Sequence, residues 1–215
     1  MNKHLSEVTN EDCMEGMARY PDKYFDLAIV DPPYGNNLNG GRSTKHNWNK
    51  NIDWDKCTKG WNLNKPNIKY FRELQRVSKN QIIWGGNYFA NMLPNSECWL
   101  IWDKGQRNFS LADGEMAWTS FHKAMRIKTI HRATSNQEER IHATQKPVVL
   151  YKWLLQNYAK QGDKIIDTHL GSGSSRIAAY EMGFDFTAFE LDKEYFDAQE
   201  KRYKAHIAQL KMELV

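Results

Sequence analysis

The sequence predicts an α/β protein, with a mostly parallel, twisted sheet and helices on both faces. Residues 25–30 (FDLAIV) form a nearly continuous apolar run, as expected for a strand buried on both faces. Residues 164–190 contain a strand, a glycine turn, a helix and a second strand, and this alternation implies parallel strands covered by helices. The chain has 215 residues, which suits a single domain over 1–215.

The first predicted strand, Phe25–Val30, ends in the run Asp31-Pro32-Pro33-Tyr34. Proline has no amide hydrogen and restricts the residue before it, so strand pairing stops at Asp31. Asp31 to Tyr34 are therefore expected at the carboxyl end of a strand. Open α/β sheets hold their ligands at that edge.

Further elements follow in chain order. Strands are predicted at Gln81–Trp84, Cys98–Trp102 and Glu115–Ser120. Pro147 suits the first turn of a helix that runs to about Lys160 and carries Leu150, Leu154 and Tyr158 on one face.

The C-terminal part is predicted as a β-α-β unit followed by a long helix. Its elements are the strand Lys164–Asp167, a turn at Gly171-Ser172-Gly173, the helix Ser174–Met182 closed by Gly183, and the strand Phe184–Glu190. The last helix starts at about Lys193 and places Phe196, Tyr203, Ile207 and Leu210 on one face.

Composition excludes several classes of protein. No apolar run approaches the roughly 20 residues that a membrane helix needs, and the polar N-terminus does not resemble a secretory signal. We therefore expect a cytoplasmic protein. The three cysteines are far apart and form no CxxC pair, so neither a disulfide framework nor a metal site is expected.

The net charge of +4 is unevenly distributed. The stretch from Gly35 to Tyr70 contains seven Lys and Arg against two Asp, interleaved with Trp48, Trp54 and Trp61. Basic and aromatic side chains in such a loop suit phosphate contact and base stacking, although a solvated surface loop has the same composition. A second basic stretch comprises Lys123, Arg126, Lys128 and Arg132.

The turn at Gly171-Ser172-Gly173 is followed by Glu190 at the end of the next strand. Glycines let the backbone pass close to a ligand, and an acid about 20 residues later can accept both hydroxyls of a ribose. Arg176 occupies the place where a dinucleotide fingerprint needs a third small residue, so NAD is disfavoured. A nucleoside ligand is implied, the alternative being a plain strand-to-helix turn.

Asp31-Pro32-Pro33-Tyr34 taken alone could be a rigid loop, but it ends a buried strand in a chain that also has the nucleoside turn. Here the sequence resembles the amino-group DNA methyltransferases that use S-adenosylmethionine. In that family D-P-P-Y marks mainly adenine-N6 enzymes and S-P-P-Y is commoner in cytosine-N4 enzymes. The resemblance therefore implies methylation of adenine N6 in DNA.

The resemblance covers most of the chain. Residues 142–147 (HATQKP) are similar to the family's H-P-T-Q-K-P segment, and residues 167–192 to its D-P-F-x-G-S-G-T-T turn, helix and following strand. The catalytic motif precedes the cofactor motif, which is the circularly permuted, beta-class order. A Rossmann-like methyltransferase fold is implied. The departures are Thr168 and His169 in place of Pro-Phe, and Ala143 in place of Pro.

The resemblance also implies residue roles. Asp31 and the Pro32 carbonyl would accept hydrogen bonds from the target amine, Pro33 would hold the loop, and Tyr34 would stack on the target base. Glu190 would bind the ribose. Asp12, on a strand neighbouring the catalytic one, would bind the cofactor's adenine, the alternative being a helix N-cap. The implied cofactor-binding residues are Asp12, Cys13, Asp31, Thr144, Gln145, Lys146, Asp167, His169, Gly171, Ser172, Gly173 and Glu190.

Several alternatives stay open. The same chemistry could act on cytosine N4 or on RNA adenine, or the fold could be a catalytically inactive nucleic-acid-binding module. Methylation at cytosine C5 is rejected, because that family places its nucleophilic cysteine after a proline, and no proline here precedes a cysteine. Segments at about 35–64 and 104–140 are expected to read DNA, with Arg107, Asn108, Arg126 and Arg132 as contact candidates.

The expected partner is DNA, with no membrane and no metal, and a homodimer is possible. A bacterial cell or phage-infected host is the expected setting. Restriction would require a separate endonuclease.

Overall fold

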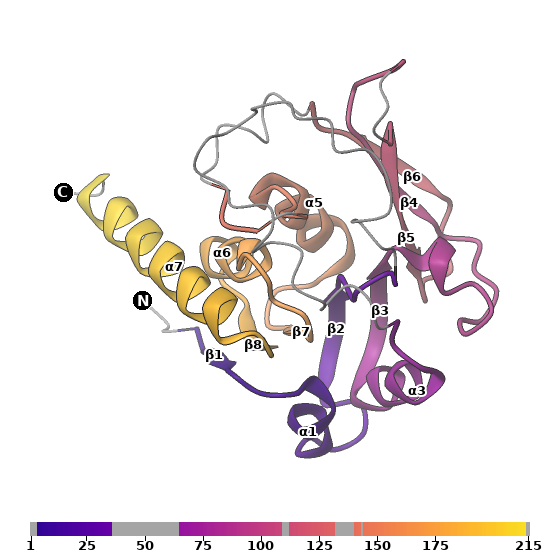
Figure 1. Cartoon of the computed structure of the whole chain (residues 1–215), viewed down its shortest axis with the longest axis horizontal. Coiled ribbons are helices and arrows are strands. Elements are labelled where there is room, and N and C mark those ends of the chain that lie inside the picture. The colour runs from indigo at the N-terminus through magenta and orange to yellow at the C-terminus, as the bar shows by residue number, and fades with distance from the viewer. Residues whose placement is uncertain (1–3, 36–64, 109–111, 132–139, 143, 214–215) are drawn as a thin grey trace.

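The computed structural model describes residues 4–35, 65–108, 112–131, 140–142 and 144–213. The described strands form one sheet in the order β1-β8-β7-β2-β3-β5-β4-β6 (Figure 1). Pairing is parallel from β1 to β3 and again between β4 and β6, while β5 runs antiparallel to both of its neighbours, β3 and β4. The predicted mostly parallel α/β sheet is confirmed.

The strands are β1 (Ser6–Thr9), β2 (Phe25–Val30), β3 (Ser78–Trp84), β4 (Leu100–Asp103), β5 (Gly114–Thr119), β6 (Arg126–Thr129), β7 (Lys164–Asp167) and β8 (Asp185–Phe189). The helices are α1 (Cys13–Ala18), α3 (Ile68–Val77), the short 3-10 helix η1 (Gly86–Tyr88), α5 (Val148–Tyr158), α6 (Ser174–Met182) and α7 (Lys193–Glu213).

Helices cover both faces of the sheet. Leu27 and Ile29 of β2 pack with buried side chains of α5 and α6, and Ala28 and Val30 pack with buried side chains of α1 and α3. Figure 1 shows these two pairs of helices on opposite sides of β2 and β7. The near-continuous apolar run of β2 is explained by this double cover, because a strand buried on both faces has no solvent side.

The C-terminal unit docks beside the N-terminal strand, as the permuted motif order predicts. Leu27 pairs with Ile165 and Ala28 with Ile166 in parallel register. Because β2 and β7 run in the same direction, Asp31 and the turn after Asp167 come to the same edge of the sheet. We call this edge, formed by the carboxyl ends of β2, β3, β7 and β8, the carboxyl edge.

Most predicted elements lie where expected. The bounds of β2, β7 and α6 agree with the prediction, and Gly183 ends α6 in a left-handed conformation (φ 72°). Pro147 is the N-cap of α5, and not a residue of its first turn. The helix α3 was not predicted, although Asn67 caps it and Tyr70, Phe71, Leu74 and Val77 form its buried face. The edge strands β1 and β6 were missed because each has only four residues and no apolar run.

The second expected recognition segment contributes to the sheet itself. Within 104–140, β5 lies between β3 and β4, and β6 forms the sheet edge with Arg126 and Lys128 on it. Residues 36–64 and 132–139, which include Arg132, lie outside the described residues. The role of both segments in recognition therefore stays a prediction.

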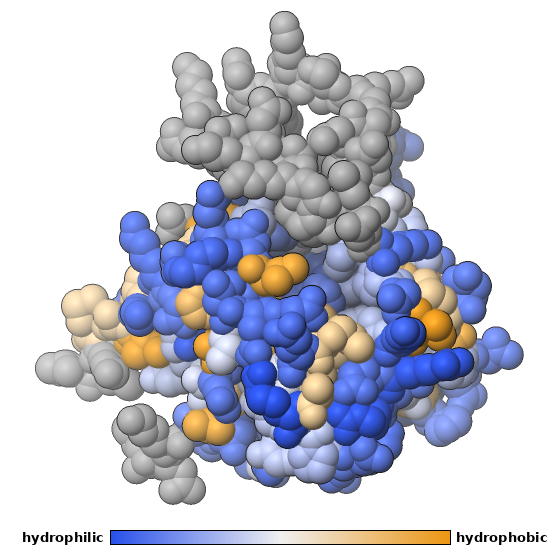
Figure 2. Space-filling model, turned by 60° about the horizontal axis from the view of Figure 1, so that its bottom comes forward, coloured by the Kyte–Doolittle hydropathy of each residue, from blue (hydrophilic) through white to orange (hydrophobic). Residues whose placement is uncertain are grey.

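The surface drawn in Figure 2 is mainly hydrophilic, with hydrophobic residues in small separate spots. None of the described helices is long and apolar enough to cross a membrane.

Candidate functional site

A cavity of about 810 Å³ lies at the carboxyl edge. That volume is in the range of cofactor sites. Most of the residues expected to bind a cofactor line it: Asp12, Cys13, Asp31, Thr144, Gln145, Lys146, His169, Gly171, Ser172 and Glu190. Pro33 also lines it, whereas Pro32, Tyr34, Asp167 and Gly173 do not. The structure thus brings two distant motifs to one cavity.

The glycine turn and Glu190 form one wall of the cavity. Gly171 and Gly173 have left-handed backbones, with φ of 53° and 74°, which glycine adopts without a Cβ clash. The backbone amide of Gly171 donates to Glu190 Oε2 at 2.7 Å, and that of Asp192 donates to Oε1 at 2.9 Å. A carboxylate has about four lone-pair sites, so Glu190 keeps acceptor capacity for a ligand.

Asp167 supports this wall from inside. Its side chain is buried and accepts from Ser175 Oγ at 2.6 Å and from the His169 amide at 3.1 Å. Burial raises the pKa of Asp167 to about 7, although the hydrogen bond from Ser175 lowers it. Asp167 therefore holds the turn and does not line the cavity.

The two residues that depart from the family motif are joined to α3. Tyr70 Oη lies 2.6 Å from Thr168 Oγ1, and Thr168 Oγ1 lies 2.9 Å from His169 Nδ1. The rings of Tyr70 and His169 meet edge to face at 5.3 Å. Burial lowers the pKa of His169 to about 4, so its imidazole is neutral at pH 7. Its contacts with Thr168 and Tyr70 give His169 a structural role, with Nδ1 hydrogen-bonded.

Asp12 lies on a different element from the one expected. It is the N-cap of α1, where its carboxylate accepts from the Met14 amide at 2.7 Å. The preceding strand β1 pairs with β8 at the sheet edge, and not with β2. The expectation that Asp12 belongs to a strand neighbouring the catalytic one is wrong, because a short capped helix follows β1. Asp12 and Cys13 still line the cavity, and burial raises the pKa of the Cys13 thiol to about 12.

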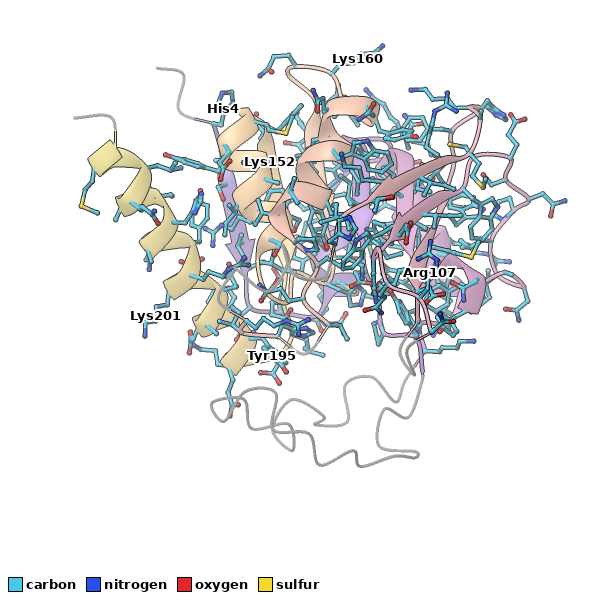
Figure 3. All side chains as sticks on the ribbon, turned by 90° about the horizontal axis from the view of Figure 1, so that it is seen from above. His4, Arg107, Lys152, Lys160, Tyr195 and Lys201 are labelled. Atoms are coloured by element: carbon cyan, nitrogen blue, oxygen red, sulfur yellow. The ribbon has the colours of Figure 1, made fainter. Side chains whose placement is uncertain are left out.

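The segment after His142 closes the cavity beside α7. The Gln145 amide donates to the His142 carbonyl at 3.2 Å, and the amide and hydroxyl of Thr144 lie within 3.3 Å of His142 Nδ1. The His142 ring packs 4.3 Å from that of Tyr195, at the start of α7. Figure 3 shows Tyr195 at the end of the molecule opposite Lys160 and His4.

Asp31 forms the second wall, together with a run of charges that alternate in sign. Its carboxylate accepts from Tyr34 Oη at 2.5 Å and from Lys146 Nζ at 2.5 Å. Lys146 also pairs with Glu115 at 3.0 Å, and Glu115 with Lys104 at 2.8 Å. We call Asp31, Lys146, Glu115 and Lys104 the charge ladder.

Sequence reasoning missed Glu115 and Lys104. Neither belongs to a motif, and no local spacing pattern marks them. Glu115 reaches the carboxyl edge because β5 is antiparallel, so that the start of β5 lies beside the end of β3. Lys104 follows β4, whose carboxyl end lies at the same edge because β4 is antiparallel to β5.

Tyr34 is held both by its hydroxyl, which donates to Asp31, and by its ring. Its ring stacks on that of Tyr88 with centroids 4.9 Å apart and 17° between the planes. Gly85, at φ 69°, permits this packing, since a Cβ there would lie 2.1 Å from the Tyr34 ring. Burial and the Asp31 carboxylate raise the pKa of Tyr34 well above its ordinary value, which keeps the hydroxyl a donor.

Fold and cavity together define the class of Rossmann-like methyltransferases. Residues 61–201, more than half of the chain, match the family model described as DNA methylase (N6_N4_Mtase). The chain belongs to this family of DNA methylases. Among the described residues, no group of three or more His, Cys, Asp or Glu is placed to hold a metal ion.

Individual relatives agree with this assignment. The Type II methyltransferase M.HinfI of Haemophilus influenzae is 24% identical over 260 residues, covering 95% of this chain and 70% of its own. The crystal structure of the M1.HpyAVI–SAM complex has a TM-score of 0.62 at 17% identity, over 92% of this chain and 100% of that one. The cytosine-N4-specific PvuII DNA methyltransferase has a TM-score of 0.62 at 13% identity, over 92% and 86%.

Proposed function

We propose that this protein transfers a methyl group from S-adenosylmethionine to the N6 amine of adenine in DNA. One observation carries the proposal. Asp31 of the Asp-Pro-Pro-Tyr motif and the Gly171–Glu190 wall border the same cavity, although they are far apart in the sequence. A methyl donor held by one wall would therefore face an amine held by the other.

The cavity fits S-adenosylmethionine in shape and charge. Glu190 has free lone pairs for ribose hydroxyls, and the Gly171 turn lets a ligand approach the backbone. The lining contains five acidic side chains, Glu11, Asp12, Asp31, Glu190 and Asp192, against three lysines, Lys65, Lys69 and Lys146, and this excess of acids favours a cationic sulfonium and ammonium. Neutral His142 and His169 add no opposing charge, because burial lowers the pKa of each to about 4.

The chemistry required of this chain is hydrogen bonding and orientation. When bound, S-adenosylmethionine supplies an electrophilic methyl group. The exocyclic amine of adenine is a poor nucleophile because its lone pair is delocalised into the ring. The Asp31 carboxylate and the Pro32 carbonyl would each accept one of the two N–H groups of this amine and localise the lone pair on nitrogen.

Positioning of the amine against the methyl group would supply much of the acceleration of methyl transfer, since well-oriented reactants reach effective molarities of about 10⁵ M or more. Pro32 and Pro33 fix the loop before substrate arrives. Tyr34 is the residue expected to stack on the target base, which would require its ring to leave its present stack on Tyr88, since Tyr34 does not line the cavity. The base would leave the duplex to reach this pocket, as for other enzymes that modify bases.

The base is assigned from Asp31, since aspartate at this motif position favours adenine in the resemblance described above. Cytosine N4 is the second candidate, and the PvuII enzyme has the same fold. A fold match at 13% identity does not choose between the bases. RNA adenine and an inactive binding module are the remaining alternatives, and the assay below separates them.

DNA is the proposed partner, with recognition assigned to the segments at 35–64 and 104–140. Arg107 lies at the carboxyl edge, paired with Asp103 at 2.8 Å, where it could exchange its partner for a phosphate. A homodimer, a cytoplasmic location and a separate restriction endonuclease remain predictions.

The direct test incubates the purified protein with methyl-labelled S-adenosylmethionine and unmethylated duplex DNA, single-stranded DNA or RNA. The nucleic acid is then digested to nucleosides, which are identified by mass spectrometry. We expect N6-methyladenine in DNA. N4-methylcytosine would contradict the base assignment, and label confined to RNA would contradict the substrate. No label, with cofactor binding shown separately, would favour the inactive module.

A further inference from the structure

The charge ladder places a buried cation on the residue expected to contact the target amine. Lys146 has a side chain only 1% exposed, and its Nζ contacts both Asp31 Oδ2 and Glu115 Oε2. It also lies 5.3 Å from the Trp84 ring centroid. A buried ammonium is stable only when it is paired, so Asp31 and Glu115 compete for one charge.

This competition bears on the proposed chemistry. A carboxylate paired with Lys146 alone would be held ionised, but its oxygens would be drawn toward the ammonium and away from an incoming amine. With Glu115 taking a share of the Lys146 charge, Asp31 keeps lone pairs available for the amine. Lys104, whose side chain is 18% exposed, balances Glu115 from the other side.

We propose that Glu115 is a positioning residue of the methyl-transfer site, which acts through Lys146 to set how strongly Asp31 is held. This inference rests on the proposed function. Lys104 acts through its ion pair with Glu115 and is therefore further from the substrate.

The protonation behaviour of the ladder agrees with this geometry. Burial opposes ionisation of Glu115, yet Lys146 and Lys104 lower its pKa to about 2. Burial alone would lower the pKa of Lys146, but Asp31 and Glu115 raise it above its ordinary value. Glu115 and Lys146 are therefore both charged at neutral pH.

Other groups also face Asp31 and are common to every variant compared below. They come from the loop after β2, from α3, from α5 and from β7. These groups are Tyr34, Tyr70, Tyr151 and Asp167.

The alternating signs give a test that a purely structural role would not pass. The methyl-transfer rate is measured against pH in single turnovers, with the nucleic acid that the wild-type protein methylates. Lys146→Met removes the cation from Asp31, so protonation of Asp31 becomes easier. The acid limb of the pH–rate profile therefore moves to higher pH, by about one unit. Glu115→Gln leaves the whole Lys146 charge on Asp31, so the limb moves to lower pH.

Lys104→Met strengthens the hold of Glu115 on Lys146 and should move the limb slightly to higher pH. Glu115→Gln should also slow methyl transfer about 10-fold, because the hydrogen-bond competition at Asp31 is worth on the order of one charged hydrogen bond. Cofactor KM should stay within about 2-fold, since Glu115 is not in the Glu190 wall. Glu97→Gln is the matched control, since the Glu97 side chain is 68% exposed. It should change neither the methyl-transfer rate nor the cofactor KM.

The outcomes separate the two proposals. A wild-type protein that methylates no nucleic acid overturns the proposed function, and this inference with it. An active wild type whose Glu115→Gln variant shows no shift, or a shift in the same direction as the lysine variants, overturns this inference alone. If Lys146→Met does not fold, the opposite shifts of Lys104→Met and Glu115→Gln decide the question.

Discussion

The two walls of the cavity are assembled in different ways. The wall that carries Glu190 is local: Asp167, Gly171, Ser175 and Glu190 contact one another within one β-α-β unit. The wall that carries Asp31 is non-local, because Lys146 is 115 residues away from it in the sequence. A local wall is specified by one short segment, whereas the other depends on the whole sheet being correctly ordered.

This difference predicts different responses to substitution. Changes in the local wall should alter affinity for the cofactor and leave the chemistry intact. Changes in the non-local wall should alter the chemical step and leave cofactor affinity intact.

Replacing Asp31 should have the largest effect. Asp31→Ala removes the acceptor of the target amine, so methyl transfer should fall by about 10³-fold or more, in the range found when a catalytic acceptor or donor is deleted. Cofactor affinity, measured by calorimetry, should change little. Asp22→Ala is the control, because Asp22 is exposed and pairs with Arg76 far from the cavity. Retained turnover would remove Asp31 from the catalytic role.

Replacing Glu190 should act on the other wall. Glu190→Ala removes the acceptor of the Gly171 and Asp192 amides and of the expected ribose hydroxyls. Cofactor Kd should rise by about 10- to 100-fold, since each hydrogen bond to a charged group is worth about 1.5 kcal/mol or more. Saturating cofactor should restore much of the rate. Unchanged Kd would show that the ribose assignment is wrong.

Asp167 should make stability depend on pH. Its folded pKa of about 7 lies above the ordinary value, so the folded state binds a proton that the unfolded chain releases. Proton binding at Asp167 contributes about 2–4 kcal/mol to the free energy of unfolding. This contribution is fully present below about pH 4 and is lost as pH rises through about 7. Chemical denaturation of Asp167→Asn should lack this slope. An identical slope in the variant would place the titration elsewhere.

Tyr70 should give the smallest effect. Tyr70→Phe removes the hydroxyl beside Thr168 Oγ1 and keeps the ring against His169. Unfolding free energy should fall by about 1 kcal/mol, as for one neutral hydrogen bond, with a small loss of cofactor affinity. Thermal denaturation with and without cofactor measures both. A loss of methyl transfer at saturating cofactor would instead place Tyr70 at the chemical step.

Much of the fold could be predicted because the relevant patterns are short in sequence. The apolar run of β2, the turn at Gly171 and the helix stop at Gly183 each depend on a few consecutive residues. The helix α3 could also have been found, since its apolar spacing and its Asn67 cap are local features. Asp12 was placed on the wrong element because one aspartate suits both a strand end and an N-cap.

The sequence by itself determined the fold class, the family and the motif residues of each wall, since each motif is contiguous and its chemistry follows from its residues. Only the tertiary structure decided which charges surround Asp31. Glu115 and Lys104 reach it because β5 turns antiparallel within the sheet, and pairing between distant strands leaves no short-range pattern in the sequence. Electrostatic fields act through space, so the charges around Asp31 are known only once the chain is folded.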